Sequence, residues 1–133
     1  MSGLILKLAP GERLLINGAV IENGDRRSRI SIKSPNANIL RLKEAIHPDE
    51  VATPVARVCY TLQLVLAGDA DPLEGRRDGL KGIEQLSQVF DDRDSRNVLD
   101  RATSDLIAGN FYQALRQLRT LLPREARFFA QVS

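Results

Sequence analysis

The spacing of apolar residues changes near residue 46, and this change limits the possible fold more than any other feature of the chain. Before it, Leu4, Leu6 and Leu8 share one face of an extended chain, and turn-forming residues interrupt the apolar stretches, as in half-buried strands. After it, apolar residues recur every three or four positions over longer stretches, which indicates amphipathic helices. The chain therefore predicts an α+β fold in which strands come first and helices follow.

Turn-forming residues divide residues 1–46 into about five short strands. Asn17-Gly18 and Asn23-Gly24 both suit type I′ turns, because Asn and Gly accept a positive φ at low cost. These strands predict an antiparallel meander or a small sandwich. The expected strands are Leu4–Leu8, Arg13–Ile16, Ala19–Glu22, Arg27–Lys33 and Asn38–Lys43, with further turns at Ala9–Glu12 and Ser34–Ala37.

Residues 53–131 predict a bundle of three to four helices. Thr53 is the expected N-cap of the first helix, which Gly68 ends, and Asp71-Pro72 begins the second. The first half of the second helix should be weak, because glycine disfavours helices and this helix contains Gly75, Gly79 and Gly82. The third helix should run from about Asp94 or Ser95 to Gly109-Asn110, and the fourth from Phe111 to a stop before Pro123, with the tail 124–131 adding a turn or two. The 133 residues suit a single domain.

Composition favours a cytoplasmic protein. Cys59 is the one cysteine, so the chain can form no internal disulfide, and one thiol in a chain of this size indicates a reducing compartment. The apolar stretch Leu4–Leu6 is interrupted by Lys7 and does not resemble a secretory signal. No apolar run approaches the ~20 residues that a membrane-spanning helix needs.

The titratable residues do not form a pattern typical of an enzyme. His47 is the single histidine and lies in an expected turn, and Cys59 falls on the apolar stripe of the first helix, where a small buried residue is expected. Asp91, Asp92 and Asp94 are more typical of a solvated loop that ends in a helix cap than of a metal site. We therefore expect no catalytic residue, no metal, no cofactor and no enzymatic activity.

Positive charge is concentrated in the first third of the chain. Residues 1–45 contain eight Lys and Arg against four Asp and Glu, whereas residues 46–133 contain eleven against thirteen. Residues 26–43 contain six basic side chains and no acidic one, and such a segment attracts polyanions. The candidate RNA contacts are Arg26, Arg27, Arg29, Lys33, Arg41 and Lys43.

Two interpretations of this basic segment stay open. In an extended strand Arg27, Arg29 and Lys33 point to one face at intervals of about 6–7 Å, which suits contact with a phosphate backbone. Alternatively, these residues form the solvated outer face of an antiparallel sheet and protect its edge. Because few aromatic residues flank the segment, RNA recognition would depend on backbone contacts, on Arg and Asn hydrogen bonds and on RNA shape.

The helical part offers candidate contacts for a protein partner. Tyr60 and Gln63 lie on one side of the first helix, either as a polar seam against the sheet or as a contact face, and the seam is favoured because Tyr has an apolar body and a hydrogen-bonding tip. Phe111, Phe128 and Phe129 would form an apolar contact surface if they were exposed, although core packing is the commoner role. An unprotected edge strand would also allow a homo-oligomer.

Several segments resemble one known family, the FlbT flagellin-mRNA regulators of alphaproteobacteria. The N-terminal segments with this resemblance are Leu6–Arg13, Ile16–Ile21, Asn23–Arg26 and Ile39–Arg41. The segments in the helical part are Ala52–Pro54 with Arg57, Tyr60 and Gln63, then Tyr112–Leu115, Leu118 and Leu121–Glu125. The resemblance covers nearly the whole chain. Two positions differ from the family pattern: Leu42–Ala45 replaces an acidic-basic-acidic run, and Cys59 replaces a bulkier apolar residue.

The resemblance implies a post-transcriptional regulator of flagellum biogenesis. Such a protein would bind the 5′ untranslated region of flagellin mRNA and promote its degradation by cellular ribonucleases. The resemblance also implies that the protein acts together with the regulator FlaF and that it contacts flagellin. An adaptor that binds these proteins without touching RNA is the alternative. No RNA-contact residue is implied by the resemblance, so the candidate contacts come from the charge pattern.

Overall fold

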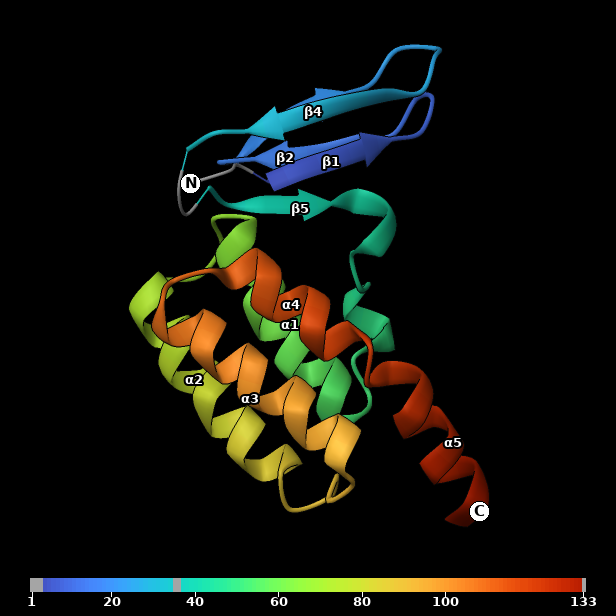
Figure 1. Cartoon of the computed structure of the whole chain (residues 1–133), viewed down its shortest axis with the longest axis vertical. Coiled ribbons are helices and arrows are strands. Elements are labelled where there is room, and N and C mark those ends of the chain that lie inside the picture. Colours follow the sequence, from blue (N-terminus) through green and yellow to red (C-terminus); the bar gives the residue numbers. More distant parts are fainter. Residues whose placement is uncertain (1–3, 35–36, 133) are drawn as a thin grey trace.

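The computed structural model describes residues 4–34 and 37–132, with side chains to residue 130. Its strands are β1 (Leu4–Leu8), β2 (Arg13–Ile16), β3 (Ala19–Glu22), β4 (Ser28–Ile32) and β5 (Ile39–Arg41). Its helices are the short η1 (Leu42–Glu44) and η2 (Pro48–Glu50), then α1 (Pro54–Leu66), α2 (Pro72–Leu86), α3 (Arg93–Ile107), α4 (Phe111–Arg119) and α5 (Leu122–Val132). The predicted α+β order is confirmed (Figure 1). Residues 35–36 of the predicted Ser34–Ala37 turn lie outside the described residues.

The strands form two small antiparallel sheets instead of one continuous meander. One sheet pairs β1 with β4, and the other has the order β3-β2-β5. The two sheets share one apolar core, which includes Leu6 and Leu8 of β1, Leu14 of β2 and Ile39 of β5. The pairing of β1 with β4 places two segments side by side that are far apart in sequence, and the basic segment thereby gains a new neighbour.

The two Asn-Gly pairs adopt different structures. Asn17 and Gly18 have φ values of 51° and 84° and join β2 to β3, which confirms the predicted tight turn. The prediction for Asn23-Gly24 is wrong, because β3 and β4 belong to different sheets and only the first pair joins adjacent strands. The Asn23 amide instead donates to the carbonyls of Ala9 and Arg26, each at 2.8 Å. Asn23 therefore holds the segment between β3 and β4 against the turn after β1.

Three of the described α-helices begin at capping residues whose side chains bond to the backbone. Thr53, Asp71 and Asp92 each accept a hydrogen bond from a backbone N–H three residues later, at 3.3, 3.0 and 3.0 Å. The predicted starts of α1 and α2 are confirmed, and α3 begins at Arg93, just before the predicted position. Because α4 ends at Arg119 and a separate eleven-residue α5 begins at Leu122, the predicted fourth helix was too long.

The glycines of α2 have a packing role that the sequence analysis missed. A Cβ atom built on Gly75 would lie 2.2 Å from Val65 Cγ2, and one on Gly82 would lie 2.4 Å from Val58 Cγ2. A Cβ atom built on Gly79, between them, would lie 3.1 Å from Leu62 Cδ2 and 3.0 Å from Leu106 Cδ1. The absence of side chains at these positions therefore lets α2 approach α1 closely, which offsets the low helix propensity of glycine.

The strands lie over one end of the helical part, next to α1 and α4 (Figure 1). Gln63 of α1 accepts from the Ile46 backbone N–H at 2.7 Å and donates to the Ile46 carbonyl at 2.9 Å. Gln63 therefore fixes the linker between the strands and the helices, whereas the sequence predicted a polar seam against the sheet or a contact face for a partner. No described helix is both long and apolar enough to cross a membrane.

Candidate functional site

Lys7 of β1 lies directly opposite Arg29 of β4 in the first sheet. Leu6 and Leu8, the neighbours of Lys7, are buried at 2% and 4% exposure, so Lys7 and Arg29 occupy the opposite, solvent-facing side of the strands. Like charges at directly opposite positions disfavour strand pairing. The structure therefore keeps two cations together at a cost in stability, which is typical of a functional surface.

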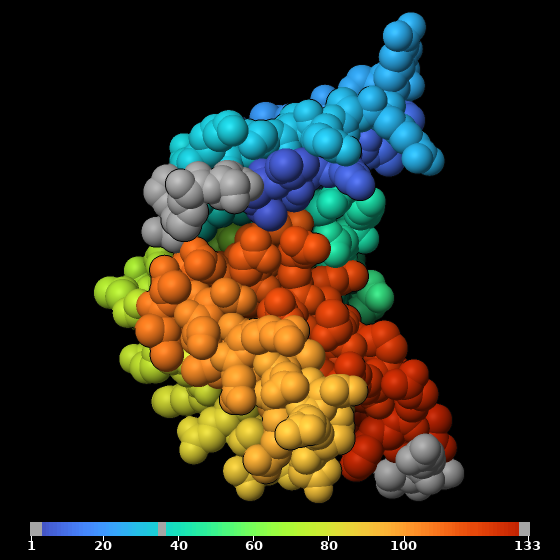
Figure 2. Space-filling model, viewed as in Figure 1, coloured from blue at the N-terminus to red at the C-terminus, as the bar shows by residue number. Residues whose placement is uncertain are grey.

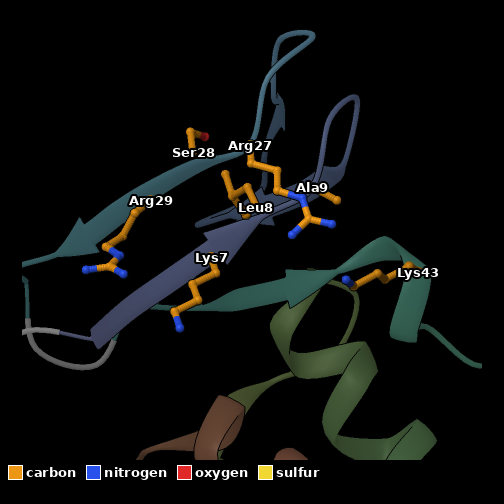
Figure 3. Close-up of a pocket in the computed structure, with 7 residues that line it drawn as sticks. All are labelled: Lys7, Leu8, Ala9, Arg27, Ser28, Arg29 and Lys43. Carbon is orange, nitrogen blue, oxygen red and sulfur yellow. The ribbon is translucent and has the colours of Figure 1, made fainter.

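These two side chains border a hollow of about 460 Å³. Arg27, just before β4, and Lys43, on η1, complete its charged lining, and Figure 3 shows the four side chains around one opening. We call this the basic hollow; its lining residues are Lys7, Leu8, Ala9, Arg27, Ser28, Arg29 and Lys43. Figure 2 shows a hollowed surface between the projecting β3–β4 segment and the chain after β5.

Most of the charge in the basic hollow is not neutralised. Lys7, Arg27 and Arg29 form no salt bridge with any described residue, and their side chains are exposed. Lys43 is 56% exposed and shares its charge, since its Nζ lies 3.5 Å from Glu12 Oε1. Arg guanidinium and Lys ammonium groups in this arrangement bind phosphate oxygens well.

Arg41 does not belong to this surface, although the sequence analysis included it. Its side chain is only 15% exposed, and its Nε and Nη2 donate to the Glu12 carboxylate at 2.7 and 2.9 Å. These hydrogen bonds lower the pKa of Glu12 from 4.5 to about 2, against the opposing effect of burial. Arg41 is therefore occupied by a partly buried ion pair, and we remove it from the candidate contacts.

Arg26 and Lys33 are exposed and flank β4 at its two ends, outside the basic hollow. Lys7 was missed by the sequence analysis, because its position in the β1 pattern gave no sign that β1 would pair with β4. The predicted alternative, a small sandwich, does not by itself determine which strands pair, and only the pairing of β1 with β4 places Lys7 opposite Arg29. The hollow thus combines three of the six predicted residues, Arg27, Arg29 and Lys43, with Lys7.

The candidate partner contacts separate into two groups. Phe111 belongs to the core at 6% exposure, and the Gln63 amide is bonded to the Ile46 backbone. Tyr60 on α1 is half-buried. Phe128 and Phe129 on α5 are 44% and 45% exposed, and their rings meet edge to face at 6.1 Å between centroids. Only these two rings offer a substantial apolar contact surface among the predicted residues.

Cys59, His47 and Asp92, the titratable residues that the sequence analysis considered for chemistry, each lie in surroundings typical of a structural role. Cys59 is fully buried, and burial raises its pKa to about 12. His47 is exposed and accepts a hydrogen bond from the Asp49 backbone N–H at 3.1 Å. The pKa of Asp92 is lowered by its hydrogen bonds to Ser95, as expected for a helix cap. No group of three or more potential metal ligands occurs within the described residues.

Comparison with known proteins gives this arrangement a context. The family model described as flagellar protein FlbT matches residues 4–129. The chain belongs to the FlbT family. This confirms the resemblance of its motifs, and the match to FlbT includes all charged residues of the basic hollow.

Named FlbT relatives match along most of their length. The flagellum biosynthesis repressor protein FlbT of Caulobacter vibrioides (strain ATCC 19089 / CIP 103742 / CB 15) is 27% identical over 98% of this chain and 92% of its own. A "Probable flagellum biosynthesis repressor protein FlbT" from Rhodopseudomonas palustris (strain TIE-1) is 30% identical over 96% and 98% of the two chains. One of the same name from Caulobacter sp. (strain K31) is 28% identical over 98% of each. No solved structure matches this chain.

Proposed function

We propose that this FlbT family member regulates flagellum biosynthesis after transcription, by binding the 5′ untranslated region of flagellin mRNA in the cytoplasm and promoting its degradation. The observation that supports this most directly is the basic hollow. Lys7, Arg27 and Arg29, which have no acidic partner among the described residues, line it together with Lys43 of η1. The names of the relatives support the regulatory role.

Phosphate contacts would supply the affinity. Each phosphate that a Lys or Arg neutralises releases bound counterions, so RNA binding through this surface should weaken steeply with salt. The hollow contains no aromatic side chain, so stacking of bases would contribute little there. Recognition of a particular RNA would then depend on its shape and on neighbouring polar side chains.

The proposal assigns no catalytic role to this protein. Cellular ribonucleases would cleave the message, and the bound protein would expose or present it to them. The buried, high-pKa thiol of Cys59 is unsuited to nucleophilic attack, and His47 has no titratable partner other than the neighbouring Asp49 among the described residues.

A salt titration with purified protein tests this proposal. The host's flagellin 5′ untranslated RNA should bind more tightly than a scrambled RNA, with log affinity falling linearly as log salt rises. Arg27→Glu and Arg29→Glu should each weaken binding at least tenfold, on the order of one lost charge-assisted hydrogen bond. Arg101→Glu on α3 is the matched control, because Arg101 is exposed and outside the hollow. Equal binding of both RNAs would refute the proposal.

A second candidate function is an adaptor that contacts flagellin or the FlaF regulator through α5. The exposed Phe128 and Phe129 favour it, since large exposed aromatic side chains often mark protein contacts. Replacement of both by serine should abolish co-purification with flagellin or FlaF after RNase treatment. Leu73→Ser on α2, where Leu73 is 67% exposed, is the control and should leave the complex intact. A complex that survives the loss of both rings would contradict this role.

A further inference from the structure

The cations that line the basic hollow come from separate elements of the fold instead of from one strand. Basic residues along a single strand would lie about 6–7 Å apart and would suit successive phosphates of an extended backbone. Here Lys7 comes from β1 beside Arg29 of β4, and Lys43 comes from η1 on the other side of the opening from Arg27 (Figure 3). Positive charge from β1, β4 and η1 therefore lines one hollow.

The positive charge that lines the hollow is larger than the negative charge of one phosphodiester within an RNA chain. A phosphodiester carries about one negative charge, whereas a terminal phosphate carries about −1.5 to −2 and a terminal triphosphate carries more. The hollow presents three cations that have no acidic partner within residues 4–34 and 37–132, and a fourth, Lys43, whose Nζ lies 3.5 Å from Glu12 Oε1. A compact polyphosphate complements this charge better than a single backbone phosphate does.

The size and lining of the hollow agree with this ligand. Its volume of about 460 Å³ falls within the range of small-molecule sites, about 300–1,000 Å³. Its uncharged side chains are Leu8, Ala9 and Ser28, and the Ser28 hydroxyl already donates to Asn23 at 2.7 Å. The lining therefore has charge for phosphates but no aromatic, amide or acidic side chain with which to select a base.

We propose that the basic hollow holds the 5′-terminal triphosphate of an RNA. This inference rests on the proposed RNA-binding function and names the part of the RNA that the site takes. Arg26 and Lys33 are exposed beyond the two ends of β4, so the nucleotides next to the bound terminus would meet further positive charge. A free nucleoside triphosphate has the same phosphate chemistry but would lack these additional contacts.

The test uses one RNA sequence in three forms, with a 5′-triphosphate, a 5′-monophosphate or a 5′-hydroxyl, titrated against the full-length chain. The triphosphate form should bind at least tenfold more tightly than the hydroxyl form, with the monophosphate between them. Lys7→Ala and Arg27→Ala should remove most of this preference. Arg101→Ala should keep it, and circular dichroism should show that all variants are folded.

The possible outcomes separate this inference from the proposed function. Equal affinity for the three forms would overturn the triphosphate site and leave RNA binding intact. No binding of any form would overturn both. Competition by free GTP or ATP at the concentration of the RNA itself would also overturn the assignment to an RNA terminus, because the site would then be a nucleotide site. Competition that needs at least a hundredfold excess of nucleotide would support it.

Discussion

The Glu12 carboxylate accepts two hydrogen bonds from the Arg41 guanidinium, 29 positions later in the chain, at 2.7 and 2.9 Å. Arg41 Nη2 also donates to the Lys7 carbonyl at 2.6 Å. Glu12 in turn accepts from the Ala9 backbone N–H at 3.0 Å. Arg41 of β5 thus bonds both to Glu12 in the turn after β1 and to the Lys7 carbonyl of β1, and it holds the backbone of Lys7 in place beneath the basic hollow.

Loss of this ion pair should destabilise the fold. Glu12→Gln removes the charge opposite Arg41, which is largely buried, so we expect a loss of about 3 kcal/mol in the free energy of unfolding. Urea denaturation measures it. Glu22→Gln is the matched control, because Glu22 pairs with Arg13 at the same 2.7 Å but both side chains are more than half exposed. The control should lose under about 1 kcal/mol, and equal losses would show that burial of the pair has no effect.

The same pair should make stability depend on acid pH. The pKa of Glu12 is about 2 in the folded protein and 4.5 as its ordinary value, so the unfolded chain binds a proton at higher pH than the folded one. The contribution of Glu12 is therefore complete above about pH 4.5 and is lost as the pH falls toward 2. The stability difference between the wild type and Glu12→Gln should shrink over this window. A constant difference would mean that Arg41 does not lower this pKa.

Substitution of Lys7 should separate stability from binding. Lys7→Glu replaces a like-charge pair with an opposite-charge pair across from Arg29, so we expect a gain of about 0.2–1 kcal/mol in the free energy of unfolding. The same change should weaken RNA binding, because it puts a carboxylate in the basic hollow. Lys7→Gln should fall between the wild type and Lys7→Glu in both measurements. A loss of stability in Lys7→Glu would contradict the cost that we assign to this cation pair.

Alanine at Gly75 should destabilise the protein, although alanine favours helices. The new Cβ would lie 2.2 Å from Val65 Cγ2, and a valine in a helix has little freedom to rotate away. We expect a loss of about 1–3 kcal/mol from overpacking, measured by thermal or urea unfolding.

Two further variants control for this effect. Gly24→Ala should be nearly neutral, because a Cβ at Gly24 would have no neighbour within 4 Å. Val65→Ala combined with Gly75→Ala should recover part of the loss, since it removes the clashing methyl group. Additive losses in the double variant would show that the close approach of α2 to α1 is not the cause.

The thiol of Cys59 should react only when the protein opens. Burial raises its pKa to about 12 and its exposure is 0%, so little thiolate forms at pH 8 and reagents have no access. We expect modification by a disulfide reagent to be on the order of 1,000-fold slower in the native protein than in urea. Rapid labelling of the native protein would mean that the core around α1 opens far more often than a stable domain allows.

Features that depend on near neighbours could be predicted from the sequence. The sequence predicts Thr53 as the N-cap of α1, because a cap bonds to an N–H three residues away, and Asp71-Pro72 as the start of α2. Asn17-Gly18 was assigned as a tight turn because both residues accept a positive φ. The buried state of Cys59 followed from its place on the apolar stripe of one helix. Each of these needs only a few consecutive residues.

Features that depend on distant contacts could not be predicted in this way. The sequence places Arg41 on the RNA surface because it lies in a basic segment, but its partner Glu12 comes from the distant turn between β1 and β2. The glycines of α2 predicted a weak helix, whereas Gly75 and Gly82 lie against α1. Lys7 joined the candidate site only because β1 pairs with β4.

The order of strands and helices, the start of α1, one tight turn and the concentration of positive charge near β4 follow from the sequence, because hydrophobic period and local hydrogen bonding are properties of adjacent residues. Which strands pair, and hence which cations lack an acidic partner among the described residues, follows from tertiary contacts. Strand pairing depends on how the two sheets share one core, so it gathered Lys7, Arg27, Arg29 and Lys43 around one hollow and directed Arg41 to Glu12.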